Sequence, residues 1–235
     1  MRVDVWSDVM CPWCAVGRAN LLEAKAAFEA EHGEPVELRW RAFELNPDAP
    51  EVVEGDYIAM LGRKYGRTRE QAQQMVDQMT DRGAEAGVRF RFDRIRPGNT
   101  FNAHRLLHLA GEHGLQDALK SRLFDAYFTE GEAVGQAEVL HRLAVEVGLP
   151  AAEVTDVLES TRFADEVRAE EHLARELGVN GVPFFVIDQR VAVSGAQPSA
   201  LLVKALAHAV DTRDAAETPT AVASGEACGP DGCAV

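Results

Sequence analysis

Two cysteines separated by two residues constrain this chain more than any other feature. Cys11-Pro12-Trp13-Cys14 follows a short apolar stretch that predicts a strand, and it opens a longer stretch that predicts a helix. The start of a helix presents unpaired backbone N–H groups and the positive end of the helix dipole, and both favour a thiolate over a thiol. Pro12 suits the first turn because that position needs no N–H donor. The pattern predicts a redox dithiol, with Cys11 as the activated nucleophile and Cys14 as the resolving thiol.

A second cysteine pair near the end of the sequence leaves alternatives open. Cys228 and Cys233 enclose Gly-Pro-Asp-Gly, a sequence that turns tightly enough to bring two sulfurs together. This pair can relay electrons to the first pair, form a small structural disulfide, or bind metal. A zinc ion held by all four cysteines is the main alternative to a redox dithiol. Structural zinc pairs usually lie on knuckles or ribbons rather than between a strand and a long helix, so we favour redox chemistry.

The composition is that of a globular protein. The 235 residues are 46% hydrophobic and 26% charged, enough for one sizeable domain or a domain with a large insertion. The net charge of −14 argues against nucleic acid and anionic membranes as partners, and no stretch approaches the length of a membrane span. Residues 1–8 carry acids where a signal peptide has an apolar run, so we expect a cytoplasmic protein. In that reducing compartment a Cys-x-x-Cys motif is expected to be catalytic rather than structural.

Hydrophobic periodicity predicts an α/β arrangement at both ends of the sequence, with helices between them. Residues 36–42 alternate between apolar and polar side chains and predict a strand, as do the short apolar runs 184–187 and 191–193. Thr68 and Gln71 form a capping-box pattern within the helical block. The composition after the last predicted helix, rich in Ala, Thr, Pro, Ser and Gly, predicts a flexible segment. We expect four parts: α/β at 1–47, a helical insertion at 48–161, α/β at 162–211 and a flexible tail at 212–235.

Val182-Pro183, at the entry of a predicted strand, is a second motif. Proline is tolerated at the first position of a strand, so it carries little information alone. Beside a Cys-x-x-Cys motif it is the arrangement of the thioredoxin fold, whose cis-proline loop lies against the dithiol. The chain resembles the DsbA family, in which an all-helical insertion interrupts a thioredoxin-like α/β fold, and it is most similar to FrnE-type members. The resemblance covers about residues 1–210 and is carried by residues 4–14, 43–47, 99–105 and 178–185.

The resemblance implies roles for residues of both motifs. Cys11 is expected to be the nucleophile and Cys14 the resolving thiol, beside a cis Val182–Pro183 bond whose loop offers a peptide edge to an extended substrate. Cys228 and Cys233 are similar to tail cysteines of such proteins. The expected catalytic residues are Cys11, Cys14 and Pro183, the expected substrate-binding residues are Pro12, Trp13, Asn99, His104 and Val182, and the expected secondary redox pair is Cys228 and Cys233.

Two further groups of polar side chains need an interpretation. His104 and His108 lie four residues apart on one predicted helix and share a face, but no third metal ligand is indicated, so we favour a partly exposed helix face. Asn99 and His104 are pocket candidates because the corresponding region of related isomerases lines a glutathione or substrate pocket. The charges along residues 163–177 are interpreted as a solvated face.

The residues between the first two cysteines bear on the redox potential. Strongly oxidising members of the family have histidine where this chain has Trp13, so we expect an intermediate potential and disulfide reduction or isomerisation. The expected partners are protein or small-molecule disulfides and a cellular thiol reductant, with glutathione as one candidate and no bound cofactor. The alternative is a glutathione-dependent isomerase or transferase. The 2-hydroxychromene-2-carboxylate isomerases and kappa-class glutathione transferases share this architecture and use a serine where this chain has Cys11.

Overall fold

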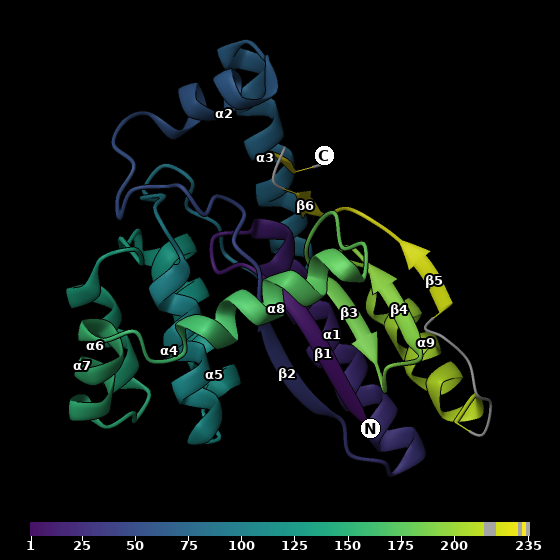
Figure 1. Ribbon diagram of the computed structural model, residues 1–235. Coiled ribbons are helices and arrows are strands. Elements are labelled where there is room, and N and C mark those ends of the chain that lie inside the picture. The colour runs from purple at the N-terminus through teal and green to yellow at the C-terminus, as the bar shows by residue number, and fades with distance from the viewer. Residues whose placement is uncertain (214–219, 230–231, 234–235) are drawn as a thin grey trace.

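The computed structural model describes residues 1–213, 220–229 and 232–233. A five-stranded sheet forms the centre of the fold, with the strand order β2-β1-β3-β4-β5 (Figure 1). β1 is parallel to β2 and β4 is parallel to β5, whereas β3 is antiparallel to both β1 and β4. The mixed sheet confirms the predicted α/β class. The strand bounds are Arg2–Ser7 for β1, Glu37–Ala42 for β2, Phe184–Ile187 for β3, Val191–Ser194 for β4 and Thr220–Ser224 for β5.

Helices cover both faces of the sheet. α1 (Pro12–His32) and α9 (Ser199–Asp211) pack together on one face, and α8 (Ala164–Glu176) crosses the other face (Figure 1). None of the helices in the described part of the chain combines the length and the apolar character needed to cross a membrane. The remaining helices lie between β2 and α8 in the sequence and are α2 (Tyr57–Tyr65), α3 (Arg69–Glu85), α4 (Phe101–Glu112), α5 (Gln116–Phe124), the π-helical turn η1 (Asp125–Glu130), α6 (Ala137–Glu146) and α7 (Ala151–Glu159).

The corner between β1 and α1 follows from the local sequence. Val3 and Val5 are fully buried in the sheet. Cys11 is the N-cap residue of α1, with an extended backbone at φ −90° and ψ 114°. Pro12 is the first helical residue, where its missing N–H leaves no hydrogen bond unmade. The strand and the cap together fix both cysteines at the start of the helix.

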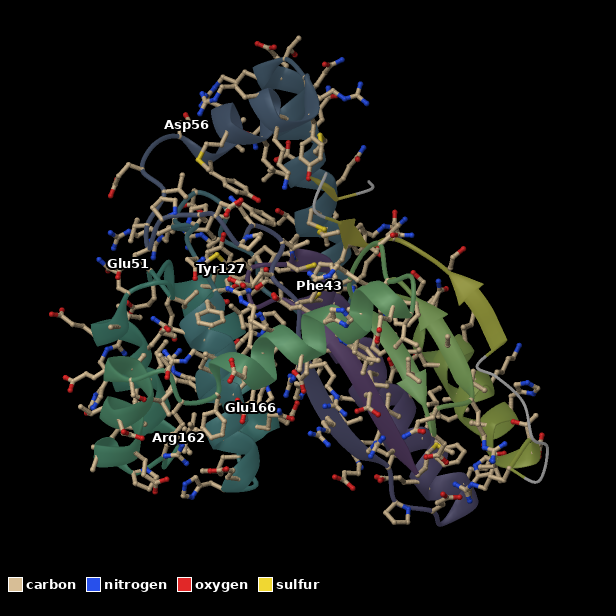
Figure 2. All side chains as sticks on the ribbon, in the orientation of Figure 1. Phe43, Glu51, Asp56, Tyr127, Arg162 and Glu166 are labelled. Carbon is tan, nitrogen blue, oxygen red and sulfur yellow. The ribbon has the colours of Figure 1, made fainter. Side chains whose placement is uncertain are left out.

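One buried cluster joins the sheet to the helical block. Phe43 follows β2 and Tyr127 lies in η1, and both belong to the cluster that also contains Cys11 and Cys14. Figure 2 shows the two aromatic side chains in the region where the sheet meets the helices. Fully burying one such side chain contributes roughly 1.5–3 kcal/mol. The dithiol motif therefore lies within a core that both parts of the chain build.

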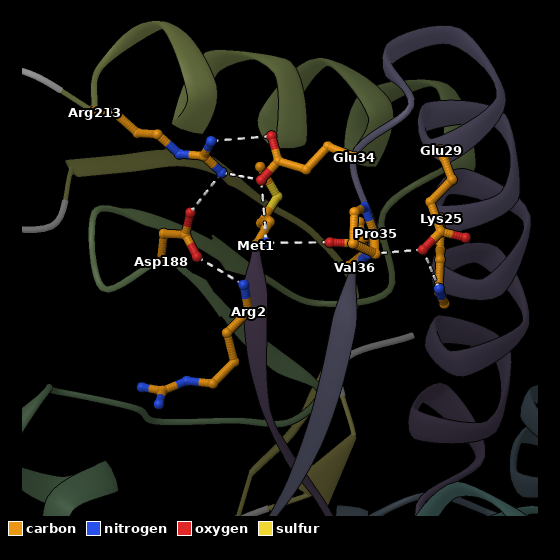
Figure 3. A network of polar contacts seen from close by, with 9 residues as sticks. All are labelled: Met1, Arg2, Lys25, Glu29, Glu34, Pro35, Val36, Asp188 and Arg213. Carbon is orange, nitrogen blue, oxygen red and sulfur yellow. Dashed lines mark hydrogen bonds and ion pairs between the residues drawn. The ribbon is translucent and has the colours of Figure 1, made fainter.

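A polar network holds the end of the sheet that is remote from Cys11 (Figure 3). Arg213, which follows α9, forms ion pairs with Glu34 and with Asp188, the latter at 3.2 Å. Asp188 in turn accepts a hydrogen bond from the Arg2 backbone N–H at 2.6 Å. The N-terminal amine of Met1 lies 3.1 Å from Glu34 Oε1. These contacts anchor the chain just before the C-terminal segment begins.

The C-terminal segment differs from the predicted flexible tail. Thr220–Ser224 form β5 on the edge of β4, and a two-residue strand β6 (Cys228–Gly229) pairs with β7 (Gly232–Cys233). The small residues of this segment form strands because pairing with β4 satisfies their backbone N–H and C=O groups. Residues 214–219, which belong to the predicted linker, lie outside the described residues.

α8 also differs from its predicted solvated face. Glu170 is only 5% exposed. Its carboxylate accepts hydrogen bonds from Arg41 and from the Ala42 backbone N–H, both at 2.7 Å. These contacts fasten α8 to β2, because a buried carboxylate requires partners of this kind. The helical charge pattern does not distinguish such a paired face from a solvated one.

Candidate active site

Both cysteines of the Cys-x-x-Cys motif are free thiols at the start of α1. The Cys14 backbone N–H donates to Cys11 Sγ at 3.2 Å, so the sulfur takes the place that an oxygen has in an ordinary N-cap. Both side chains are fully buried. The motif therefore presents two sulfurs within one helical turn, with a backbone donor directed at the first.

Burial changes the acidity expected for Cys11. Burial, the neighbouring Cys14 thiol and the Asp8 carboxylate raise the pKa of Cys11 well above its ordinary value, although the Cys14 backbone N–H lowers it. The sequence predicts an activated thiolate from the helix terminus alone. In the structure the cost of removing a thiolate from water is larger than the stabilisation that one amide supplies. Cys11 therefore requires exposure to solvent or additional positive charge in order to ionise.

The loop before β3 lies against the first cysteine. The Val182–Pro183 peptide bond is cis, as the family resemblance implies. Cys11 Sγ lies 3.6 Å from the carbonyl oxygen of Val182. Gly17 of α1 approaches the same loop so closely that a Cβ at this position would lie 2.7 Å from Pro183 Cγ. The absence of a side chain at Gly17 is what allows α1 and the loop to meet.

The C-terminal segment pairs with this loop. The Val182 N–H donates to the Cys228 carbonyl at 2.6 Å, and the Cys228 N–H donates to the Val182 carbonyl at 2.7 Å, which makes an antiparallel bridge. Cys228 is fully buried and disulfide-bonded, and it pairs with Cys233 in the register of β6 and β7. A cysteine in a disulfide offers no thiolate to a metal ion. This state of Cys228 is compatible with the structural and redox roles that the sequence leaves open.

Lys120 of α5 places a buried amine beneath the motif. Its side chain is fully buried, and its Nζ donates to the Ser7 carbonyl at 3.2 Å. The amine lies 5.6 Å from the ring centroid of Trp40 and 5.1 Å from that of Phe124, within the range of a cation–π contact. Burial lowers the pKa of Lys120 to about 8, although a thiolate at Cys14 favours its charged form. The amine is therefore electrostatically linked to the dithiol.

Asp8 and His104 form a buried contact beside the motif. Asp8 Oδ2 accepts a hydrogen bond from the Leu45 N–H at 2.8 Å, and Asp8 Oδ1 lies 3.5 Å from His104 Nε2. Burial alone would raise the pKa of Asp8. The combined effects of His104 and the Leu45 amide outweigh burial, so the pKa of Asp8 is lowered. His108 faces a different carboxylate, with its Nε2 3.2 Å from Glu170 Oε2. The two histidines are thus largely buried and separately paired, unlike the partly exposed face that we expected.

Asn99 has a role at the start of α4. Its side-chain amide donates to the Pro47 carbonyl at 3.0 Å, and its oxygen accepts a hydrogen bond from the Phe101 N–H at 2.9 Å. The second contact satisfies one of the free N–H groups of the first helical turn. Asn99 and His104 line neither of the hollows that border Trp13. These contacts position both side chains, and the pocket role that the resemblance implies for them stays a prediction.

Two hollows border Trp13, a residue that is itself 2% exposed. The first is small and apolar, and it lies between α1 and the pair α2–α3. The second is a cavity of about 430 Å³ between α1, the end of α3 and the start of α9. Its polar lining consists of Asn20, Arg82, Glu85, Gln197, Ser199 and Glu226. The apolar hollow is lined by Pro12, Trp13, Tyr57, Leu61, Tyr65, Met75, Val76, Met79 and Phe92.

Three features of the site were not predicted from the sequence. In the sequence, Lys120 resembles any lysine of a helix. Only its position between the apolar residues Leu119 and Leu123 indicates that it is buried. Gly17 is a small residue inside a helix, where glycine usually lowers stability, and that cost is a weak indication of close packing. The contact between Cys228 and Val182 has no local signal, because the two residues are far apart in the chain.

Comparisons with known proteins agree with this geometry. The family model for the DSBA-like thioredoxin domain matches residues 2–207. The uncharacterized protein YwbO of Bacillus subtilis (strain 168) is 31% identical over 210 residues, which are 88% of this chain and 96% of that protein. The crystal structure of probable DsbA oxidoreductase SCO1869 from Streptomyces coelicolor is 44% identical and has a TM-score of 0.84, covering 100% of this chain and 99% of that chain.

A more distant structure shares the fold. The cytosolic disulfide reductase DsbM from Pseudomonas aeruginosa, solved with GSH, is 17% identical and has a TM-score of 0.60, covering 90% of this chain and 98% of that chain. At this identity the match concerns the fold alone. The family match over most of the chain, together with the cis-proline loop beside a free dithiol, assigns the protein: it belongs to the DsbA-like oxidoreductase family.

Proposed function

We propose that this protein is a thiol–disulfide oxidoreductase of the reductase or isomerase type that acts through Cys11 and Cys14. The observation that carries the proposal is the position of Cys11 Sγ, which lies 3.2 Å from the Cys14 N–H and 3.6 Å from the Val182 carbonyl oxygen. The first contact stabilises a thiolate, and the second places the sulfur beside the backbone edge that an extended client would pair with.

The proposed reaction transfers two electrons from the dithiol to a client disulfide. The Cys11 thiolate attacks one sulfur of the client, forms a mixed disulfide and releases the other client sulfur as a thiolate, which takes up a proton. The Cys14 thiolate then attacks Cys11 Sγ and releases the second client thiol. The protein is left with a Cys11–Cys14 disulfide, which a cellular thiol such as glutathione reduces at the expense of its own oxidation. An isomerase would return the electrons to another pair of client cysteines.

Lys120 is proposed as a positioning residue for the second step. Cys14 must lose its proton inside the protein, where an isolated thiolate is costly. A buried ammonium that couples electrostatically to Cys14 lowers that cost. Because the pKa of Lys120 is about 8, the amine is charged at neutral pH and can supply this stabilisation. The stabilisation declines as the pH rises above 8.

The hollows beside Trp13 support the proposed partners. The apolar hollow has a volume of only about 40 Å³, but Met75 and Met79 in its wall are flexible side chains that can adapt to an apolar group of a client. The polar cavity has Arg82 and the start of α9 at Ser199 in its lining, and Arg82 is ion-paired with Glu85 of the same lining at 3.1 Å, so the cavity offers polar contacts of both signs to a small thiol such as glutathione. We therefore propose protein or small-molecule disulfides as substrates and glutathione as a redox partner rather than a bound cofactor.

The intermediate potential and the cytoplasmic location remain part of the proposal. Trp13 adds no positive charge beside Cys11, which supports reduction or isomerisation over strong oxidation. DsbM, which shares the fold, is described as a cytosolic disulfide reductase. Both points are compatible with a protein that works against the glutathione pool.

The test is a redox titration of the full chain in graded glutathione buffers, read by thiol alkylation and mass spectrometry. We expect a reversible two-electron transition at Cys11 and Cys14, and we expect Cys14→Ser to accumulate a mixed disulfide at Cys11. If these two cysteines never oxidise together across the range, the proposal fails. A glutathione-dependent isomerase or transferase that uses the polar cavity beside Trp13 would then be favoured, and glutathione-dependent turnover of a small molecule that survives Cys11→Ser would support it.

A further inference from the structure

The C-terminal segment occupies the backbone edge that the proposed function assigns to clients. Val182 has one N–H and one C=O available for an extended partner, and Cys228 bonds to both, at 2.6 and 2.7 Å. An incoming client strand requires the same two groups for an antiparallel pair. Cys228 and a client backbone therefore exclude each other at Val182.

The same contact lies next to the proposed nucleophile. The Val182 carbonyl oxygen that accepts the Cys228 N–H is also the oxygen that lies 3.6 Å from Cys11 Sγ. Cys11, Cys14 and Cys228 are all fully buried and belong to one cluster. A solvent-borne disulfide therefore cannot reach Cys11 in this arrangement unless residues that cover it move.

Glycines on both sides allow the segment to sit this close. A Cβ at Gly181 would lie 3.2 Å from the Cys228 carbonyl oxygen, and a Cβ at Gly195 would lie 2.3 Å from the Gly225 carbonyl carbon. Gly195 also has a φ of +79°, a conformation that other residues rarely adopt. The approach is thus as close as the backbone permits.

Hydrogen bonds guide the segment along the sheet to this position. The Gly225 N–H donates to the Ser194 carbonyl and the Ala196 N–H donates to the Glu226 carbonyl, both at 2.8 Å. Before them β5 follows β4 in parallel, and Arg213 is held at the far end of the sheet (Figure 3). The path has anchors at both ends, and the contact with Val182 is the one nearest the dithiol.

We infer that residues 224–229 form an internal strand that occupies the client edge and shields Cys11, so that a client must displace this strand before the dithiol can react. The identity of the displaced partner, a client, rests on the proposed function. The shielding of Cys11 is independent of the proposed function. Since the strand is tethered, it competes at a high effective concentration, and only a client that binds better than the strand gains access. The device would select extended clients that form both backbone hydrogen bonds with Val182.

The test loosens the strand without removing a cysteine. Gly225→Pro in the full chain removes the N–H that donates to Ser194, and it adds bulk where a Cβ would lie 2.2 Å from Gln197 Nε2. The readout is the rate at which iodoacetamide modifies Cys11, measured by mass spectrometry while Cys228 remains in its disulfide. We expect the rate to rise at least about tenfold, because it follows the fraction of open molecules. An unchanged rate overturns the inference.

Arg213→Ala is the matched control, because it releases the remote anchor and leaves the contact with Val182 intact. Its rate should stay within about twofold of that of the original chain, since it leaves the open fraction almost unchanged. A rise as large as that of Gly225→Pro would show that any disturbance of the segment has this effect, and the inference would fail.

Two further measurements keep the result interpretable. Gly181→Val crowds the strand from the loop side and should raise the Cys11 rate if Gly225→Pro does not fold, as judged by circular dichroism. A synthetic peptide of residues 220–229 with serine at position 228, added to the Gly225→Pro protein, should slow the alkylation of Cys11 in a saturable way, and an absence of slowing counts against an occupied edge. The proposed function fails separately, when Cys11 is accessible in these variants yet forms no disulfide with Cys14.

Discussion

The two cysteine pairs of this protein lie in opposite backbone settings. Cys11 and Cys14 occupy the first turn of a helix, where both are free thiols and an amide is directed at the first sulfur. Cys228 lies on a two-residue strand, is disulfide-bonded, and pairs with Cys233 in register. A helix start favours a thiolate that can react, whereas an antiparallel pair brings two positions close enough for a lasting bond. Their backbone setting distinguishes the two pairs more clearly than their spacing does.

The largest expected effect is the loss of the first sulfur. Cys11→Ser should reduce disulfide exchange on a model client by roughly a hundredfold or more, because a serine hydroxyl is un-ionised at neutral pH and cannot form a mixed disulfide. The measurement is the initial rate of client reduction in a glutathione buffer. A variant that keeps most of its rate would assign the reaction to the second pair and reverse the comparison.

The next effect concerns the buried ammonium of Lys120, which we propose acts on the first cysteine pair and not on the second. Lys120→Met should slow the resolution of the mixed disulfide roughly tenfold below pH 8, because the charge that favours a thiolate in this buried site is lost. The effect should be smaller above pH 8, where Lys120 is neutral in the original chain. The measurement is the pH profile of client release from a preformed Cys11 adduct. A profile identical to that of the original chain would remove Lys120 from the mechanism.

The same variant has a signature in stability. Between pH 8 and the ordinary lysine pKa, the folded chain binds fewer protons than the unfolded chain, so the stability of the original protein rises with pH in that window. Lys120→Met removes this dependence. The unfolding free energy of the original chain should therefore rise by about 3 kcal/mol relative to that of the variant across the window. Lys204→Met, at an exposed position of α9, is the control and should show no such change. Urea unfolding at pH 7, 9 and 10.5 measures both variants.

A smaller effect tests the packing that brings the first pair against the cis-proline loop. Gly17→Ala should lower stability by about 1–3 kcal/mol, because its Cβ would lie 2.7 Å from Pro183 Cγ and the loop must move. Gly111→Ala in α4 is the matched control, because a Cβ at Gly111 would have its nearest neighbour at 3.7 Å. The higher helix propensity of alanine should stabilise this variant by up to about 1 kcal/mol. Thermal unfolding should give opposite signs for the two variants. Equal signs would mean that the contact with the loop is loose.

The smallest effect belongs to the second pair. A double variant, Cys228→Ser with Cys233→Ser, keeps the length of the covering strand and removes its sulfur chemistry. Its rate of client reduction should stay within about threefold of that of the original chain. Any change should be an increase, because a less constrained strand opens more often. The assay is the same client reduction as for Cys11→Ser. A loss comparable to that of Cys11→Ser would make the second pair an obligatory electron relay and would end the distinction between the pairs.

Much of the site could be anticipated because its parts are short and local. The Cys-x-x-Cys motif, the strand before it and the helix after it are encoded by neighbouring residues, and the Val182–Pro183 motif stands at the entry of its strand as expected. The pocket roles of Asn99 and His104, which come from a resemblance, stay predictions, whereas their contacts with Pro47 and Asp8 had no signal in the sequence. Contacts of this kind depend on which elements pack together, and a helical pattern does not specify that.

The sequence by itself determined the α/β class, the helical block and the placement of a dithiol at a helix start, since these depend on periodicity, caps and residue type within a few positions. Only the tertiary structure decided that Cys11 is buried with a raised pKa, that the Lys120 amine is buried against Ser7 and interacts electrostatically with the dithiol, and that Cys228 pairs with Val182. Each of these joins residues from distant parts of the chain. Burial and electrostatic coupling arise from packing between such segments, and this packing leaves no local pattern in the sequence from which it could be predicted.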